Sequence, residues 1–224
     1  MIRLHAVVEG PTEKAFVDQV LGPELGARNM IVDSRAVKTG QHRESVFRGG
    51  ISKYLKLKND LILWMKQDQR PDAWFTTMID LYALPRDFPG YDDCMGWPGP
   101  SQRVECLEER LGRDLAHRRF IPYLQLHEFE ALLFCDPNQF EIEFPGTPSV
   151  AGQLAAIRSQ FPGPEDIDDS PEFAPSKRIL KILPMYTKSV AGPAIANRIG
   201  LPTLRRECPH FNRWIERIEA AAAR

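Results

Sequence analysis

Apolar segments alternate with amphipathic segments along the first 126 residues of the chain. The apolar segments, which are rich in β-branched residues as buried strands are, cover residues 2–8, 30–37, 73–79 and 120–126. The segments between them place apolar side chains at helical spacing, for example around Phe16, Leu61 and Leu107. This alternation predicts an α/β fold with a mostly parallel sheet of four or more strands and helices on both faces, a Rossmann-like arrangement. We expect the first, third and fourth strands to be adjacent.

Two stretches depart from this pattern. Residues 81–100 contain four prolines and are expected to form a long loop. After residue 135, proline-rich and acidic pieces such as 162–175 separate short helices, and an amphipathic helix around Trp214 ends the chain. We therefore predict an α/β domain at 1–135 and a helical extension at 136–224 that packs on the same domain.

Carboxylates follow three of the predicted strands. Glu9 comes after the first strand, Asp80 after the third, and Glu128 and Glu130 after the fourth. The carboxyl ends of parallel strands meet at one edge of a sheet, where ligands bind in open α/β folds. Carboxylate oxygens are preferred ligands of Mg²⁺ and Mn²⁺. The pattern predicts a divalent-cation site at this edge.

Several of the acidic positions have a second interpretation. Glu13 falls in the first turn of the helix after Glu9, where the helix dipole alone favours an acid by about 0.3–1 kcal/mol; the alternative is a further metal ligand. Glu128 and Glu130 are two residues apart at a strand-to-helix junction, so we expect one of them, preferably Glu128, to face the site. His127 is either a ligand or, more commonly for such a histidine, a structural residue.

The acidic motifs carry a resemblance. Glu9-Gly10 after the first strand and Asp80 after a later strand are similar to the pattern of the Toprim superfamily, which includes topoisomerase and primase domains and nucleases of the overcoming-lysogenization-defect (OLD) type. More closely, the chain resembles a bacterial Toprim-like family of unknown function. That closer resemblance rests on residues 8–13, 80–85, 88–90, 126–133 and 208–211. Tyr82 stands where many Toprim proteins have a second Asp, so the second acid must come from elsewhere.

The resemblance implies a Mg²⁺- or Mn²⁺-dependent nuclease that cleaves DNA or RNA. Glu9 and Asp80 would be catalytic, together with Lys188, because in OLD-type nucleases a lysine near the metals contacts the scissile phosphate. Relatives imply a role in bacterial defence beside an ATPase of the ABC or OLD type. Two alternatives stay open: a non-catalytic module that docks on such an ATPase, and an enzyme of phosphotransfer to a small nucleotide.

Composition restricts how nucleic acid could bind. The 224 residues have a formal net charge of −1, so no overall basic field exists and any phosphate contact needs local cations. A glycine-rich stretch supplies candidates at Lys38, His42, Arg43 and Arg48, although an ordinary solvated loop is the alternative. No apolar run has the length of a membrane span. The four cysteines lack Cys-x-x-Cys spacing, which argues against a disulfide scaffold or a zinc site and fits a reducing cytoplasm.

Overall fold

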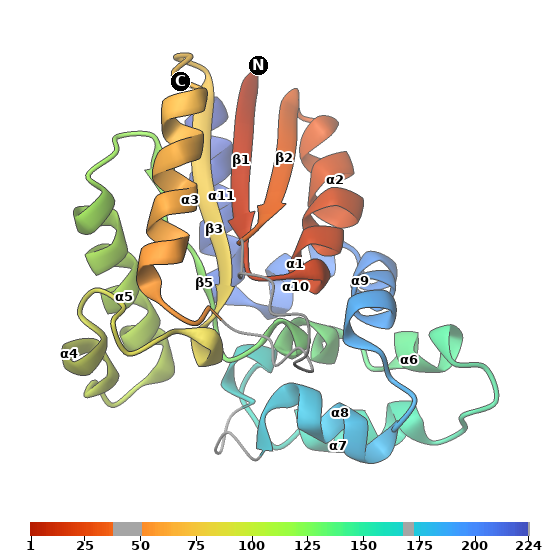
Figure 1. The fold of residues 1–224 in the computed structure, drawn as a ribbon. Coiled ribbons are helices and arrows are strands. Elements are labelled where there is room, and N and C mark those ends of the chain that lie inside the picture. Colours follow the sequence, from red (N-terminus) through yellow and green to blue (C-terminus); the bar gives the residue numbers. More distant parts are fainter. Residues whose placement is uncertain (38–50, 168–172, 224) are drawn as a thin grey trace, which may run out of the picture.

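A computed structural model describes residues 1–37, 51–167 and 173–223. Its centre is a parallel sheet with the strand order β2-β1-β3-β4, in which β5 also pairs with β3 (Figure 1). The strands are β1 (Ile2–Val8), β2 (Met30–Ala36), β3 (Ala73–Asp80), β4 (Phe120–Ile121) and β5 (Leu124–Gln125). The predicted α/β class is confirmed, as is the adjacency of the first, third and fourth predicted strands.

The fourth predicted strand is divided in two at Pro122. Proline has no N–H to donate to a ladder, so pairing with β3 stops after Ile121 and resumes at Leu124. The side chain of Thr77 fills the gap between the two pieces. Its hydroxyl accepts a hydrogen bond from the N–H of Tyr123 at 3.0 Å and donates one to the carbonyl of Tyr123 at 2.8 Å. The chain thereby stays beside β3 and delivers the following residues to the carboxyl edge of the sheet.

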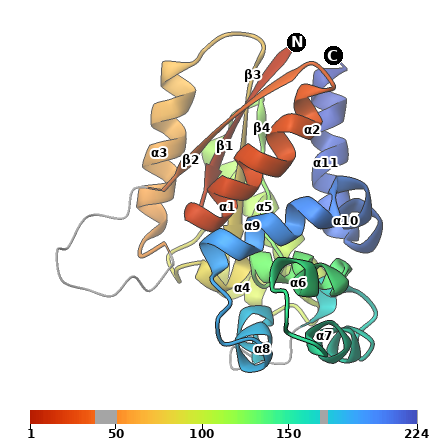
Figure 2. The ribbon, with the colours of Figure 1, turned by 90° about the vertical axis from the view of Figure 1, so that its right-hand side faces the viewer.

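Helices cover both faces of the sheet, as the alternation predicted (Figure 2). One face carries a helical run made of α1 (Pro11–Phe16), a π-helical turn η1 (Val17–Leu21) and α2 (Gly22–Gly26), together with α11 (Pro209–Ala222). The other face carries α3 (Tyr54–Gln67) and α5 (Pro100–Leu115). Successive residues of β1 serve opposite cores, because Ala6 and Val8 face the first layer and Val7 faces the second.

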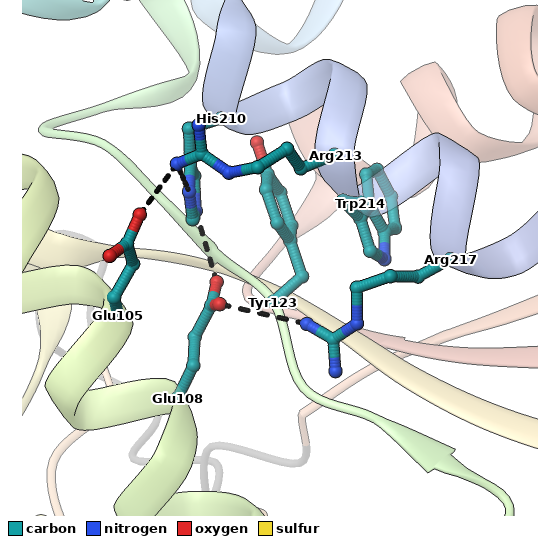
Figure 3. Close-up of a pocket in the computed structure, with 7 residues that line it drawn as sticks. All are labelled: Glu105, Glu108, Tyr123, His210, Arg213, Trp214 and Arg217. Atoms are coloured by element: carbon teal, nitrogen blue, oxygen red, sulfur yellow. Dashed lines mark hydrogen bonds and ion pairs between the residues drawn. The ribbon is translucent and has the colours of Figure 1, made fainter.

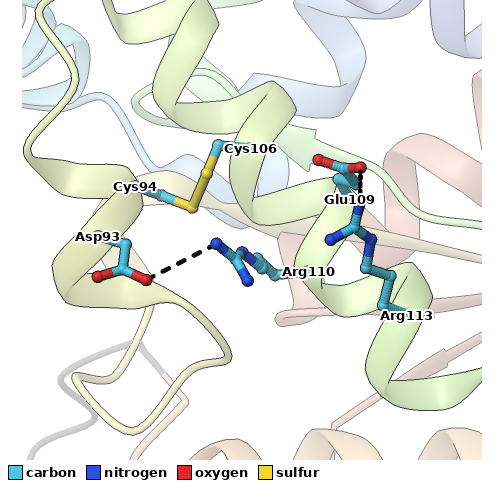
Figure 4. Close-up of a disulfide and its surroundings, with 6 residues drawn as sticks. All are labelled: Asp93, Cys94, Cys106, Glu109, Arg110 and Arg113. Atoms are coloured by element: carbon cyan, nitrogen blue, oxygen red, sulfur yellow. Dashed lines mark hydrogen bonds and ion pairs between the residues drawn. A yellow bond between two sulfur atoms is a disulfide. The ribbon is translucent and has the colours of Figure 1, made fainter.

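The stretch 81–100 is not wholly a loop. It contains a short 3₁₀ helix, η2 (Leu81–Ala83), and the helix α4 (Tyr91–Met95). A disulfide joins Cys94 of α4 to Cys106 of α5, with the two Cα atoms 5.6 Å apart (Figure 4). Cysteine spacing in the sequence argued against a disulfide scaffold and did not indicate this single bond, which forms because packing of α4 on α5 brings together cysteines that are twelve residues apart.

Helices beyond β5 cover the carboxyl edge of the sheet (Figure 1). They follow the 3₁₀ helix η3 (Phe129–Cys135), and we call them the cap segment: α6 (Asn138–Glu143), α7 (Val150–Arg158), η4 (Pro164–Asp166), α8 (Pro175–Ile182), α9 (Lys188–Ile199) and α10 (Leu201–Glu207). Ile195 and Leu204 of the cap segment share one core with Leu4 of β1 and Trp214 of α11. In the part of the chain that the structure describes, no helix is long and apolar enough to span a membrane.

Candidate functional site

The two central carboxylates come from adjacent strands. Glu9 directly follows β1, and Asp80 is the last residue of β3. The backbone N–H of Asp80 donates a hydrogen bond to Oε2 of Glu9 at 3.1 Å, and the N–H of Glu9 donates to the carbonyl of Met78 at 3.1 Å. Asp80 is only 7% exposed, and its Oδ1 atom has no hydrogen-bond partner among the described residues. Parallel pairing of β1 with β3 therefore places both acids together.

Glu13 closes the turn between β1 and α1. Its Oε2 accepts a hydrogen bond from the N–H of Gly10 at 2.9 Å, so Glu13 caps the start of α1 besides lying in its first turn. The side chain is buried, and its charge contributes to raising the pKa of Glu9. Glu13 thus combines a capping role with membership of the acidic cluster.

Glu128 and Glu130 both join the cluster from the start of η3. Glu130 is 1% exposed and accepts hydrogen bonds from Oη of Tyr186 at 3.3 Å and from Nζ of Lys188 at 3.1 Å. Glu128 accepts one from the N–H of Ser176 at 3.1 Å and lies 3.8 Å from Nζ of Lys188. Lys188 therefore bridges the two carboxylates, and Glu130 is the more deeply buried of the pair. We call Glu9, Glu13, Asp80, Glu128 and Glu130 the carboxylate cluster.

Burial and mutual repulsion raise the pKa values within the carboxylate cluster. Burial first, and then repulsion from Glu13, raise the pKa of Glu9 to about 8. Burial raises the pKa of Glu130 to about 7 despite the nearby lysine, and burial with repulsion from Glu9 raises the pKa of Asp80 well above its usual value. Burial opposes the charge of Lys188, but Glu130 and the other acids outweigh it and raise the pKa of that amine. One lysine beside so many buried carboxylates leaves an environment that favours a further cation.

The carboxylate cluster offers only oxygen donors, which hard divalent cations prefer. Every donor in the carboxylate cluster is a carboxylate oxygen, and the Asp80 Oδ1 atom is buried with no described hydrogen-bond donor. No group of three or more His, Cys, Asp or Glu side chains in the described ranges is arranged to ligate an ion directly. Backbone N–H groups and Lys188 occupy several of the oxygens instead. A cation that keeps part of its water shell, as Mg²⁺ does, suits this arrangement.

A glycine allows α9 to carry Lys188 to the cluster. A Cβ atom at Gly192 would lie 2.9 Å from Oη of Tyr186 and 3.1 Å from Cε1 of Phe129. Such distances are too short for a packed interior, so the helix can approach this closely only without a side chain at that position. Lys188 is the first residue of the same helix, and its placement over the cluster depends on this approach.

His127 has a structural role. Its Nε2 atom lies 2.9 Å from the carbonyl oxygen of Glu165, its ring is 5.5 Å from that of Tyr82, and the residue is fully buried. Burial lowers its pKa to about 4. The backbone of His127 is left-handed, with φ at 61°, which turns the chain from β5 into η3. The two glutamates that follow are aimed at the cluster as a result.

The structure describes only one of the basic residues that were predicted to contact phosphate. Lys188 contacts the carboxylate cluster, as described above. Lys38, His42, Arg43 and Arg48 lie outside the described residues, so the prediction that they contact phosphates stays a prediction.

A cavity of about 320 Å³ lies elsewhere, between α5 and α11 (Figure 3). It is lined by Glu105, Glu108, Tyr123, His210, Arg213, Trp214 and Arg217. Glu108 accepts a hydrogen bond from the N–H of Leu124 at 2.8 Å, and Nε2 of His210 lies 3.1 Å from the carbonyl of Leu124 and 3.0 Å from Glu108. These side chains satisfy the outer backbone groups of the edge strand, which is how proteins protect a sheet edge. None of the carboxylate cluster lines this cavity.

Comparison with known proteins places the chain in a family. The family model described as "Domain of unknown function (DUF4276)" matches residues 8–219. The chain belongs to the DUF4276 family. No curated protein and no solved structure matches it. The match spans every member of the carboxylate cluster and Lys188, but DUF4276 carries no activity in its description, and the resemblance to Toprim proteins and OLD nucleases stays a prediction.

Sequence reasoning missed three residues of this DUF4276 site. Tyr186 donates to Glu130, the N–H of Ser176 holds Glu128, and Gly192 admits α9. Tyr186 stands two residues before Lys188, and this position is the sequence feature that could have pointed to Tyr186. Ser176 acts through its backbone, and Gly192 lies inside an ordinary helical pattern, so neither has a sequence signature.

Proposed function

We propose that this protein is a divalent-cation-dependent enzyme that cleaves phosphodiester bonds in nucleic acid. The observation that carries the proposal is the carboxylate cluster at the carboxyl edge of a parallel sheet, with a buried Asp80 oxygen that has no hydrogen-bond partner among the described residues. Buried acids with raised pKa values are typical of functional sites, since structural ion pairs usually lower the pKa of the acid. The Toprim-like order of Glu9 and Asp80 in the sequence supports the same reaction class.

Asp80, Glu9 and Glu130 are the residues that would hold Mg²⁺ or Mn²⁺. A bound cation of this kind polarises phosphoryl oxygens and lowers the pKa of a coordinated water. Glu13 fixes the turn after Glu9 through Gly10, and Glu128 is held by the N–H of Ser176. Those two acids fix the backbone conformation at the edge of the site and add to its negative potential.

Lys188 is the residue proposed to contact the scissile phosphate. Its side chain is 44% exposed, while its amine touches Glu130, so it reaches both solvent and the carboxylate cluster. If Glu130 held a cation, the amine of Lys188 would be free to bind a phosphate oxygen from the solvent side. There it would stabilise the negative charge that develops during cleavage.

A non-catalytic docking module is the second candidate. Tyr82 stands in place of the second Toprim acid, and the net charge of −1 gives no general attraction to nucleic acid. In this case the chain would dock on an ATPase of the ABC or OLD type without cleaving nucleic acid. A role in bacterial defence is compatible with either candidate.

Cleavage assays separate the two candidates. Supercoiled plasmid, single-stranded DNA and structured RNA are incubated with the protein in Mg²⁺, in Mn²⁺ and in chelator, with and without a candidate ATPase. The nuclease proposal expects cation-dependent cleavage of at least one substrate, abolished in Glu9→Gln and unchanged in Glu109→Gln. Glu109 is a matched control because it is an exposed acid of α5 paired with Arg113. Absence of cleavage by the wild type under every condition would favour the docking module, and equal cleavage by Glu9→Gln would remove the carboxylate cluster from the reaction.

A further inference from the structure

Two free cysteines meet at the base of the cap segment. The Sγ atoms of Cys135 and Cys208 are 3.3 Å apart, although the residues are separated by 73 positions in the sequence. Cys135 ends η3, the helix that carries Glu130, and Cys208 caps the start of α11. The cap segment runs from the first cysteine to the second, so the two thiols stand at its two ends.

We propose that Cys135 and Cys208 form a reversible disulfide that clasps the two ends of the cap segment together. A disulfide has an S–S length of about 2.05 Å, so the sulfur atoms need to approach by roughly 1.3 Å. Cys135 is partly exposed, so an oxidant can reach its sulfur. Cys208 is fully buried beside it, in position to form the disulfide once Cys135 is oxidised. This inference does not depend on the proposed nuclease activity.

The oxidant we name is a hydroperoxide. The thiolate of Cys135 attacks the terminal peroxide oxygen; an S–O bond forms, the O–O bond breaks, and the leaving oxygen takes a proton and departs as water or an alcohol. The sulfur of Cys208 then attacks the sulfenic sulfur; the S–S bond forms, the S–O bond breaks, and the hydroxyl leaves with the Cys208 proton as water. The two thiols lose two electrons and the peroxide gains them. Burial raises the pKa of the Cys208 thiol, which disfavours its own attack on the peroxide. Its role in the second step follows from its position 3.3 Å from the sulfur of Cys135.

The disulfide between Cys135 and Cys208 would constrain the stretch of chain that covers the carboxylate cluster. Ser176, Tyr186 and Lys188 all belong to the stretch between the two cysteines, and they hold Glu128 and Glu130. Closing a loop of this length restricts the unfolded chain more than closing a short one does. The oxidised protein is therefore expected to resist unfolding of the cap segment at temperatures where that segment unfolds in the reduced protein.

The test compares reduced and peroxide-treated protein. Wild type is fully reduced, treated with stoichiometric hydrogen peroxide, alkylated and digested, and the peptides are mapped by mass spectrometry. The inference expects a linked peptide containing Cys135 and Cys208, a mass lower by two hydrogen atoms for this pair, and reversal by dithiothreitol. It also expects a Tm higher by on the order of 5–10 °C than that of the reduced protein, with slower proteolysis of the cap segment.

Cys135→Ser is the control for the other disulfide of the molecule, the one between Cys94 and Cys106. This variant keeps Cys94 and Cys106, so any Tm shift that it shows on oxidation belongs to that pair and is subtracted. Cys135→Ala serves in its place if the serine variant does not fold, and the peptide map of the wild type needs neither. Alkylation of both Cys135 and Cys208 after peroxide treatment, or conversion of Cys135 to a sulfinic acid without a linked peptide, would overturn the inference.

Discussion

Replacing Glu9 with Gln should stabilise the cation-free protein at neutral and alkaline pH. Burial and the charge of Glu13 raise the pKa of Glu9 from 4.5 to about 8 in the native state. The native protein therefore holds a proton on this group over a range in which the unfolded chain has lost it. The contribution of Glu9 to the free energy of unfolding is fully present below pH 4.5, declines as pH rises, and is lost above pH 8. A glutamine does not ionise, and its amide oxygen can still accept the N–H of Asp80.

The size of the expected change in unfolding free energy follows from the shift in the pKa of Glu9. One pKa unit corresponds to about 1.4 kcal/mol, so a rise from 4.5 to about 8 sets an upper limit of about 5 kcal/mol at pH above 8. Glu9 is partly open to water, and Glu13 and Asp80 share the same repulsion, so removal of one charge relieves only part of it. We expect Glu9→Gln to raise the free energy of unfolding by about 1–3 kcal/mol at pH 8 and to change it little at pH 5.

The assay is urea unfolding of the wild type, Glu9→Gln and the surface control Glu109→Gln at pH values from 5 to 9 in chelator. The difference between wild type and variant is the readout, because His127 and His210 also have shifted pKa values and contribute to the slope of each protein. Glu109→Gln should follow the wild type at every pH. A Glu9→Gln protein that is less stable than the wild type at pH 8 would refute the reasoning, since it would mean that the ionised carboxylate is favourably bound without a cation.

Three further predictions concern the residues around the carboxylate cluster. Lys188→Met should lower the rate of any cleavage by on the order of 10²-fold with little change in substrate affinity, measured by single-turnover kinetics and by binding in Ca²⁺. Gly192→Val should destabilise the protein by about 1–3 kcal/mol in thermal unfolding and displace α9, because its side chain would collide with Tyr186 and Phe129. Glu165→Leu should cost about 2–4 kcal/mol in urea unfolding, because the backbone N–H groups of His210 and Phe211 would lose their buried acceptor, and a stability equal to the wild type would contradict this.

Much of the fold could be predicted because its signals are local. The bounds of β1 match the apolar run 2–8, and the helical spacing around Leu61 and Leu107 corresponds to α3 and α5. The fourth strand was predicted as one run, 120–126, and neither its division at Pro122 nor the bridging hydroxyl of Thr77 was foreseen, since the bridge depends on tertiary pairing. The disulfide between Cys94 and Cys106 was missed for the same reason.

The candidate site was predictable in outline for a topological reason. Parallel strands bring Glu9, Asp80 and the acids after β5 to one edge whatever the loops between them do. Which of Glu128 and Glu130 is buried depends on the left-handed turn at His127 and on the partners of each acid in the cap segment. Those partners come from distant positions with no motif, and only the packing of α8 and α9 over the edge shows them.

Calorimetric titration with Mn²⁺ tests the central claim most directly. The wild type and Asp80→Asn are titrated at pH 7.5, since Asp80 carries the buried oxygen that has no described partner. We predict saturable binding to the wild type and binding at least about tenfold weaker to Asp80→Asn, because an amide is a poorer ligand for a hard cation than a carboxylate. Equal binding by both proteins, or no binding by the wild type, would contradict it.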